Sequence, residues 1–204
     1  MAMNRFDTAE KMLRGCWNLL YRATRSGRQA FRTPVIGTLD TAGRQAALRT
    51  VILRQAFPQR RELTFYSDAR SEKIAQLRAS PRISCHFYDA KRQLQVRARG
   101  SATLHIGDEQ AREHWRDISL EGRKNYASVE PPATPAGEAT RGLPEFWRDD
   151  MPLERTDYAF DHFAVVRIGV DEMDCLLLHP EGHQRSIFQW APAPGEWRGG
   201  WVVA

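Results

Sequence analysis

Short β-prone segments bounded by turn residues recur along this chain, and no other feature of the sequence limits its fold as strongly. Residues 31–39, 46–54 and 82–88 are such segments, each rich in apolar or β-branched side chains and followed by turn formers. Residues 93–105 alternate between apolar and polar side chains, which is typical of a strand with one buried face. The chain holds about seven short strands of this kind. They predict a mostly β fold, an antiparallel β-barrel with helices at its periphery.

The first helix is expected at the N-terminus. Asp7-Thr-Ala-Glu10 has the form of a capping box, in which an acceptor side chain is followed three residues later by Glu. Apolar residues then recur at helical spacing between Met12 and Leu20. Together these features predict a helix over about residues 7–23.

Further along the chain, helices are expected at 71–79 and 108–118. Residues 122–150 are interrupted by prolines and glycines, so they are predicted to form a long surface loop. A loop of this length in a compact domain is usually functional or mobile, and it is a candidate cover for a site. Since the sequence has no internal repeat and no clear boundary, residues 1–204 are expected to form a single domain.

Several classes of protein are excluded by what the sequence lacks. No apolar run approaches the roughly 20 residues that span a bilayer, so no membrane association is expected. The polar N-terminus lacks the apolar core of a signal peptide, which predicts a cytoplasmic protein. Three widely spaced cysteines form no CxxC pair, so neither a disulfide framework nor a metal site is predicted. Rossmann, P-loop and G-x-S-x-G motifs are also missing.

Charge is divided unevenly between the two halves of the chain. Residues 1–100 carry 20 basic and 7 acidic side chains, whereas residues 101–204 carry 10 basic and 18 acidic ones. The basic first half favours an anionic ligand, and the acidic second half is suited to face a basic surface. A small bound anion and a nucleic acid are both compatible with this distribution.

A candidate anion site lies between residues 49 and 73. Arg49 begins an apolar strand segment, and Ser71 and Lys73 open the helix expected at 71–79. The start of a helix offers free backbone N–H groups and positive dipole density, to which a hydroxyl and an ammonium group are added here. These residues form a plausible phosphate cradle. A solvated basic face on a small barrel is the competing interpretation.

The order of the motifs resembles a known family. The motifs are RTVILR, LTFYSDARSEK, SPRISCHFYD and LQVRARGSA, followed by a tail from Val165 to Gln189. Over roughly residues 30–190 this order is similar to the pyridoxamine 5′-phosphate oxidase-like, FMN-binding split-barrel superfamily. The resemblance implies an antiparallel split β-barrel that binds FMN. It also implies a homodimer with both FMN sites at the subunit interface.

The resemblance assigns roles residue by residue. Arg49 would reach the FMN phosphate, together with Ser71 and Lys73, and the strand after Arg49 would line the flavin ring. Gln95, five residues before a strand glycine, would contact the flavin from the other subunit. The complete set implied at the cofactor is Arg49, Thr50, Val51, Ile52, Leu53, Arg54, Tyr66, Ser67, Ser71, Lys73, Gln95 and Arg185.

The chain departs from the true oxidases at positions that matter. Glu72 precedes Lys73, where the oxidases have a basic residue, and Arg54 stands where they have Lys. Residues 114–122 keep none of the oxidases' substrate-phosphate residues. Glu181 replaces a substrate-contacting Arg, and its carboxylate would repel a phosphorylated substrate. These departures predict that FMN binding is kept, and they argue against the oxidation of a vitamin B6 phosphate.

Three functions therefore stand as hypotheses. The first is an FMN-dependent oxidoreductase of unknown substrate, in which the flavin supplies the redox chemistry and no catalytic side chain can be named. The second is a non-enzymatic FMN carrier or sensor. The third and least favoured is a nucleic-acid-binding barrel that uses the basic first half. Flavin absorbance in the purified protein would separate the first two from the third.

Overall fold

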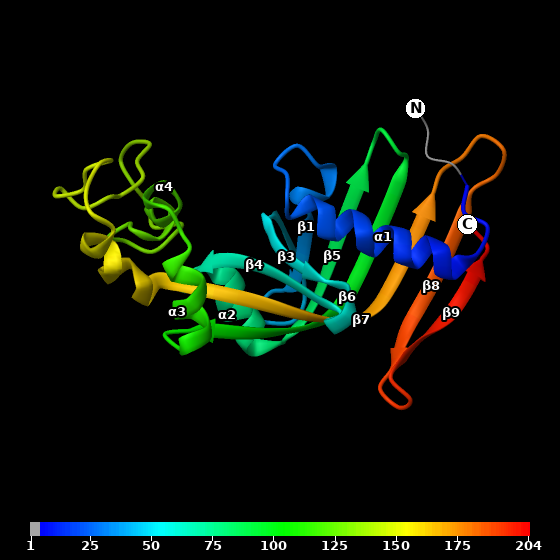
Figure 1. Ribbon diagram of the computed structural model, residues 1–204. Coiled ribbons are helices and arrows are strands. Elements are labelled where there is room, and N and C mark those ends of the chain that lie inside the picture. Colours follow the sequence, from blue (N-terminus) through cyan, green and yellow to red (C-terminus); the bar gives the residue numbers. More distant parts are fainter. Residues whose placement is uncertain (1–4) are drawn as a thin grey trace.

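The computed structural model describes residues 5–204 and shows a nine-stranded antiparallel sheet that does not close on itself. Seven strands follow one path in the order β2-β1-β5-β6-β7-β4-β3, and β8 and β9 continue from β7 (Figure 1). The strands are β1 (Val35–Leu39), β2 (Ala46–Thr50), β3 (Leu53–Phe57), β4 (Glu62–Asp68), β5 (Arg82–Asp89), β6 (Leu94–Ile106), β7 (Phe163–Leu177), β8 (Gln184–Ala191) and β9 (Glu196–Val202). The predicted antiparallel split barrel is confirmed.

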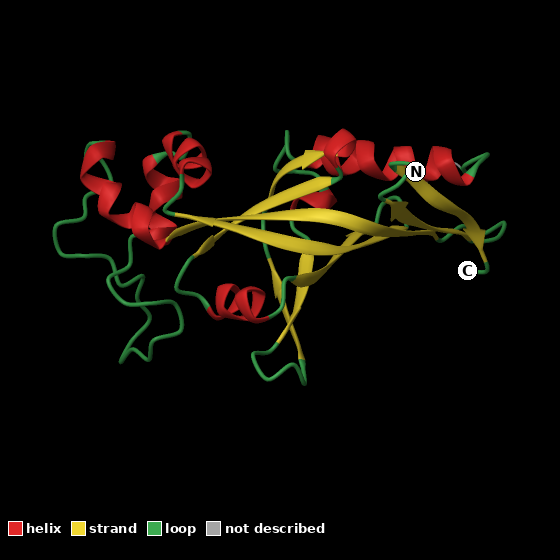
Figure 2. Ribbon diagram, turned by 90° about the horizontal axis from the view of Figure 1, so that it is seen from below, coloured by secondary structure: helices red, strands yellow, loops and turns green. Residues whose placement is uncertain are grey.

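Four α-helices lie around the sheet in residues 5–204. They are α1 (Ala9–Ala23), α2 (Glu72–Ala79), α3 (Glu109–Arg116) and α4 (Leu120–Arg123). Short 3-10 helices add Ala30–Arg32, Pro58–Arg60, Lys124–Tyr126 and Leu153–His162. Helix α1 runs along one side of the sheet (Figure 2), whereas α3 and α4 gather at the end opposite the β8–β9 hairpin (Figure 1). No described helix is long and apolar enough to cross a membrane.

Strands β6 and β7 form the centre of the sheet. Their side chains alternate as the sequence predicted, so that Val96 and Ala98 are buried while Gln95 and Arg97 face the other side. The two strands shift register at Gly100. A Cβ at this position would lie 2.0 Å from the carbonyl oxygen of Gly169, so only glycine allows the two backbones to approach this closely.

Helix α1 covers the apolar face of the sheet. Met12, Cys16 and Leu20 recur along one side of the helix and are fully buried against the strands. A fully buried side chain of this size stabilises the fold by about 1.5–3 kcal/mol, so this helix is an integral part of the core. The predicted cap is displaced by one residue, because Thr8 accepts the hydrogen bond from the Lys11 backbone while Asp7 pairs with the Lys11 ammonium.

One strand prediction is corrected by the structure. The strand expected at 46–54 is divided, since β2 ends at Thr50 and β3 begins at Leu53 to pair with β4 rather than with β1. Strand β7, in contrast, is continuous from Phe163 to Leu177, because a β-bulge opposite Gly100 absorbs the irregularity in its pairing with β6.

Part of the charge asymmetry of the sequence is neutralised inside the chain. Arg82, Arg97 and Arg99 of the basic half pair with Asp171, Asp174 and Glu172 of the acidic half, respectively. These pairs lie across the neighbouring strands β5, β6 and β7. The acidic second half therefore neutralises part of this basic surface within a single copy of the protein.

Candidate functional site

The end of β4 and the start of α2 bring three polar side chains together. The Lys73 ammonium donates to Ser67 Oγ at 3.1 Å and to Ser71 Oγ at 3.3 Å. The two hydroxyls lie 3.0 Å apart and are buried, and Ser71 is the N-cap residue of α2. The first N–H groups of this helix have no acceptor within it, so backbone donors lie beside the same cluster.

Arg49 is fixed next to this cluster by two buried polar side chains. Its guanidinium donates to Gln76 Oε1 at 2.8 Å and to Thr38 Oγ1, and the Thr38 hydroxyl also donates to Gln76 Oε1 at 2.5 Å. Gln76 has no exposed surface. Neither Thr38 nor Gln76 was predicted to belong to the site. We call Arg49, Ser67, Ser71 and Lys73 the phosphate cradle.

The electrostatics of the phosphate cradle favour an anion. Burial lowers the pKa of the Lys73 ammonium, and the nearby Arg49 lowers it further, against a weaker opposing effect of Asp68. Among the described residues neither Arg49 nor Lys73 has a carboxylate within ion-pair distance, and Asp68 is occupied by Arg70. Two partly buried cations without a counter-ion are costly, and a phosphate would remove this cost. The residues present therefore fit the phosphate of FMN.

Glu72 does not turn toward the cradle. Its carboxylate accepts a hydrogen bond of 2.7 Å from the Gln76 amide, one helical turn further on. Gln76 in turn accepts from Arg49, so Glu72 orients the amide that holds the guanidinium. The charge of Glu72 also raises the pKa of Arg49, opposing the larger lowering by burial. The acidic residue that stands in place of a basic one thus supports the cradle through Gln76.

The segment expected to line the flavin ring lies at the break between β2 and β3. Thr50 ends β2, and the backbone N–H of Val51 donates to the Pro34 carbonyl at 3.0 Å. Ile52 is 43% exposed, whereas Leu53 is buried in the core. The segment between the two strands therefore exposes an apolar side chain next to backbone that is not paired in the sheet.

Arg54 and Tyr66 form a second polar group next to this segment. The Arg54 guanidinium lies over the Tyr66 ring, 5.1 Å from its centroid, and its Nε is buried without a hydrogen-bond partner in residues 5–204. The Tyr66 hydroxyl lies 2.9 Å from His114 Nδ1, a contact that the sequence did not predict. Burial raises the pKa of Tyr66 against the effect of Arg54, and burial together with Arg167 lowers the pKa of His114.

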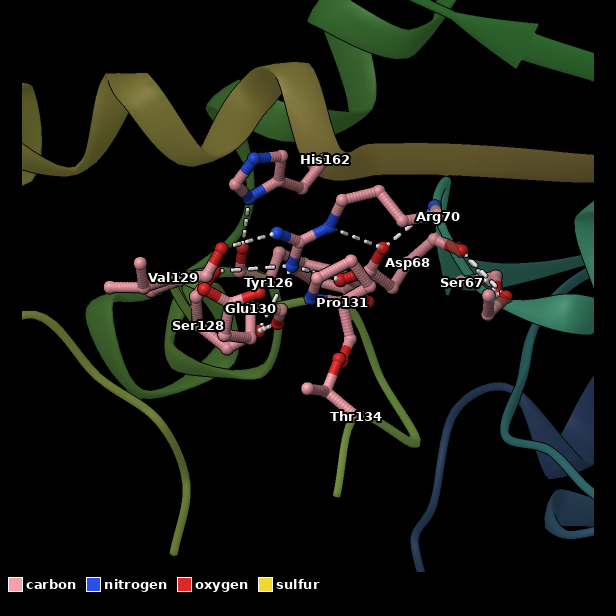
Figure 3. Close-up of polar contacts among 12 residues, drawn as sticks. Ser67, Asp68, Arg70, Tyr126, Ser128, Val129, Glu130, Pro131, Thr134 and His162 are labelled. Carbon is pink, nitrogen blue, oxygen red and sulfur yellow. Dashed lines mark hydrogen bonds and ion pairs between the residues drawn. The ribbon is translucent and has the colours of Figure 1, made fainter. Parts of the chain in front are cut away.

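Arg70 connects the phosphate cradle to the long segment after α4. Its guanidinium binds both carboxylate oxygens of Asp68, at 3.1 and 2.8 Å, and donates to the carbonyls of Ser128 and Val129 (Figure 3). His162 contacts the Tyr126 carbonyl at 3.0 Å beside this contact (Figure 3). The loop expected at 122–150 is therefore anchored near its start, at Ser128 and Val129.

Gln95 and Arg185 lie on a different face of the sheet. Gln95 on β6 pairs in register with Leu176 on β7, and Leu176 pairs with Arg185 on β8. Arg49 is in register with Ile36, Cys85 and Ala98 on the neighbouring strands, and these three side chains point into the core. Arg49 therefore lies on the core face of the sheet, opposite to the face that carries Gln95 and Arg185. Along the sheet, β2 and β8 are five strands apart, about 24 Å at 4.8 Å per strand. One chain does not bring these two parts of the predicted site together.

Known structures share this fold. An FMN-binding protein related to pyridoxamine 5′-phosphate oxidase from Nostoc punctiforme superposes with a TM-score of 0.73 at 22% identity, covering 94% of this chain and 96% of its own. PhzG from Burkholderia lata gives 0.71 at 14% identity, covering 100% and 99%. A general stress protein 26-related protein from Clostridium acetobutylicum gives 0.53 at 10% identity, covering 86% and 94%. None of the curated proteins compared with the chain matches it in sequence.

The open sheet defines the split-barrel fold. Residues 16–106 match the family model of the pyridoxamine 5′-phosphate oxidase, FMN-binding domain. This range contains the phosphate cradle and residues 50–53, the segment expected to line the flavin ring. The resemblance inferred from the motifs is confirmed, and FMN is the cofactor of the matched domain.

Proposed function

We propose that this protein is an FMN-dependent oxidoreductase that works as a homodimer, with each FMN held between two subunits. The carboxylate-free pair of Arg49 and Lys73 carries the assignment, because it is built for a doubly charged phosphate. Ser67 and Ser71 would complete the phosphate contacts, and residues 50–53 would lie along the ring. When bound, FMN supplies hydride or electron transfer, and the protein supplies binding and orientation.

The dimer is proposed because the remaining predicted contacts lie too far from the cradle. Gln95 and Arg185 face away from the core on strands distant from β2, so a second copy is the natural source of these side chains for each flavin. The same face exposes Leu48, which is 69% accessible, beside a hollow of about 270 Å³ that His86 and Arg97 help to line. An exposed apolar residue on a hollowed face is suited to association.

A substrate with an acidic group is proposed for the region of Arg54. The guanidinium of this arginine lies over Tyr66 and pairs with no carboxylate in residues 5–204, so it would be free to bind one from a substrate. PhzG, which shares the fold, was crystallised with tetrahydrophenazine-1-carboxylic acid, an aromatic acid of this kind. Tyr66 and His114 would hold a proton between them at the edge of this region.

Subunit complementation tests the shared site. One chain carries Arg49→Ala and Lys73→Ala, and the other carries Gln95→Ala and Arg185→Ala. Each homodimer should bind FMN poorly, whereas the co-expressed heterodimer should recover one intact site per dimer. A heterodimer that binds no more FMN than the two homodimers would reject a site shared between subunits.

Enzymatic turnover is tested separately. The holoprotein is reduced anaerobically with NAD(P)H or with a screened set of amines and aromatic acids, and its flavin absorbance is followed before and after oxygen is admitted. Rapid reduction and reoxidation by one donor supports an oxidoreductase. A flavin that stays oxidised with every donor would instead favour the carrier or sensor.

A further inference from the structure

A buried carboxylate lies on the face of the sheet that carries Gln95 and Arg185. Asp174 on β7 is only 3% exposed although its side chain points away from the apolar core. Arg185 donates to it twice, from Nε at 3.1 Å and from Nη2 at 2.9 Å, and Arg97 donates to the same carboxylate. We call Arg97, Asp174 and Arg185 the arginine clamp.

The strand register places the arginine clamp beside the residues proposed to face the flavin. Arg97 lies directly opposite Asp174 in the β6–β7 pair, and Gln95 is two residues before Arg97 on the same face. The Gln95 amide oxygen is already in contact with His86 Nε2, at 3.2 Å. The amide nitrogen of Gln95 and the two guanidinium groups are thus the donors of this surface.

The charges of the arginine clamp do not cancel. Two guanidinium groups share one carboxylate, which leaves one positive charge, whereas the neighbouring pair of Arg99 and Glu172 is balanced. The Nε of Arg97 is also buried without a hydrogen-bond partner among residues 5–204. A surplus cation with an unsatisfied donor is suited to an electron-rich acceptor that carries little or no full charge.

The clamp is stable at neutral pH. Burial acts to raise the pKa of Asp174, but the hydrogen bonds and charges of Arg185 and Arg97 outweigh it, so the pKa is lowered. The carboxylate therefore stays ionised and holds both arginines in fixed positions. This costs the conformational entropy of two side chains that would otherwise be free to move.

We propose that Asp174 is a positioning residue for the flavin ring. It fixes the guanidinium groups of Arg185 and Arg97 against the electron-rich edge of the ring. The FMN concerned is the one that is bound mainly by the partner subunit. This inference rests on the proposed shared site. It adds Arg97 and Asp174 to the residues expected to control the ring, as distinct from the phosphate.

The test uses Asp174→Asn, with Glu172→Gln as a matched control on the same strand and the same face. The asparagine variant should bind both FMN and riboflavin about tenfold more weakly, because the ring is common to both ligands. With FMN at saturation, its visible absorption band should also shift from that of the wild-type holoprotein, since a guanidinium has moved. The control should leave both affinities within about twofold and the band unchanged.

Arg97→Met keeps the test decisive if Asp174→Asn fails to fold. It retains the pair of Asp174 and Arg185, and it should still weaken both flavins about threefold and shift the band. Folded variants that bind both flavins like the wild type, with an unchanged band, would overturn the role of the clamp. A merely structural role would lower thermal stability without a spectral change. If the wild-type protein itself binds no FMN, it is the proposed function that fails.

Discussion

The phosphate cradle and the arginine clamp are both cationic, but they are built in opposite ways. In the cradle, Arg49 and Lys73 are partly buried and meet only neutral oxygens from hydroxyl, amide and carbonyl groups. In the clamp, Arg97 and Arg185 converge on a buried carboxylate. The cradle contains no carboxylate to compensate its positive charges, whereas in the clamp one carboxylate compensates one of the two positive charges.

This difference indicates what each cluster can bind. A phosphate brings up to two negative charges, so a cluster without a carboxylate gains the most from it. A flavin ring is neutral when oxidised and is better matched by a rigid surface with a single surplus charge. Removing parts of each cluster should therefore affect different portions of the same ligand.

The largest effect is expected from Arg49→Ala combined with Lys73→Ala. FMN affinity should fall at least tenfold, and about a hundredfold if each charge-assisted contact contributes about 1.5 kcal/mol. Riboflavin, which lacks the phosphate, should bind as it does to the wild type. Fluorescence titration of the apoprotein measures both constants.

The control for this double variant is Arg28→Ala with Lys91→Ala, which removes two exposed positive charges remote from the cradle motifs. It should leave FMN affinity within about twofold at physiological salt, because exposed charges are screened. An equal loss in the two double variants would mean that net charge, rather than the cradle, attracts FMN.

Gln76→Met should have the next largest effect. The change preserves volume but leaves the buried Thr38 hydroxyl, the partly buried Arg49 guanidinium and the Glu72 carboxylate without their shared partner. The free energy of unfolding should fall by about 1–3 kcal/mol, and FMN affinity should fall several-fold. Urea denaturation of the apoprotein and flavin titration measure the two effects. Unchanged values of both would show that Gln76 does not fix the guanidinium.

The pH dependence separates the two clusters further. Because the pKa of Lys73 is lowered, the ammonium loses its proton below its usual range, and the preference for FMN over riboflavin should decline as the pH rises from 7 toward 10. The unliganded fold should gain stability over the same interval, since the unfolded chain binds more protons there. Lys73→Met should flatten both profiles, and a preference that stays constant in the wild type would exclude Lys73 as a phosphate ligand.

Asp174 also makes the stability of the fold rise with pH, but over the acidic range. Its lowered pKa means that this contribution is complete above the pKa of the unfolded chain and is lost as the pH falls through the lower value. Acid should therefore weaken the ion pairs of the clamp, whereas alkali should weaken the affinity of the cradle for phosphate.

The smallest effect is expected from Arg70→Ala. This change releases the carbonyls of Ser128 and Val129 and frees the Asp68 carboxylate next to the cradle. The segment after α4 should be cleaved faster by limited proteolysis, and FMN affinity should fall about twofold to threefold. Arg141→Ala, an exposed change in the same segment, should alter neither, and identical cleavage rates in the two variants would exclude the anchor.

The sequence predicted the sheet and the cradle well because both depend on local patterns. Alternation located β6, helix spacing located α1, and the order of hydroxyl and basic residues located Ser71 and Lys73. The strand is divided at residues 51–52, where the sequence has no glycine or proline to signal a break. The cause of the division is the switch of pairing partner from β1 to β4, which the sequence does not reveal.

The supports of the cradle and the clamp could not be predicted for a similar reason. Gln76 is a polar residue in a short helix, and nothing local distinguishes it from a solvated side chain, although it is completely buried. Asp174 and Arg97 lie 77 residues apart in sequence and meet only through the β6–β7 register. Thr38 offered one usable signal, since it shares the inward parity of Ile36 on β1.

The most direct test of the account is a titration of the purified apoprotein with FMN and with riboflavin under the same conditions. The cradle predicts that FMN binds at least tenfold more tightly, because only FMN supplies the anion that Arg49 and Lys73 lack. Equal affinities for the two flavins, or no binding of either, would contradict it.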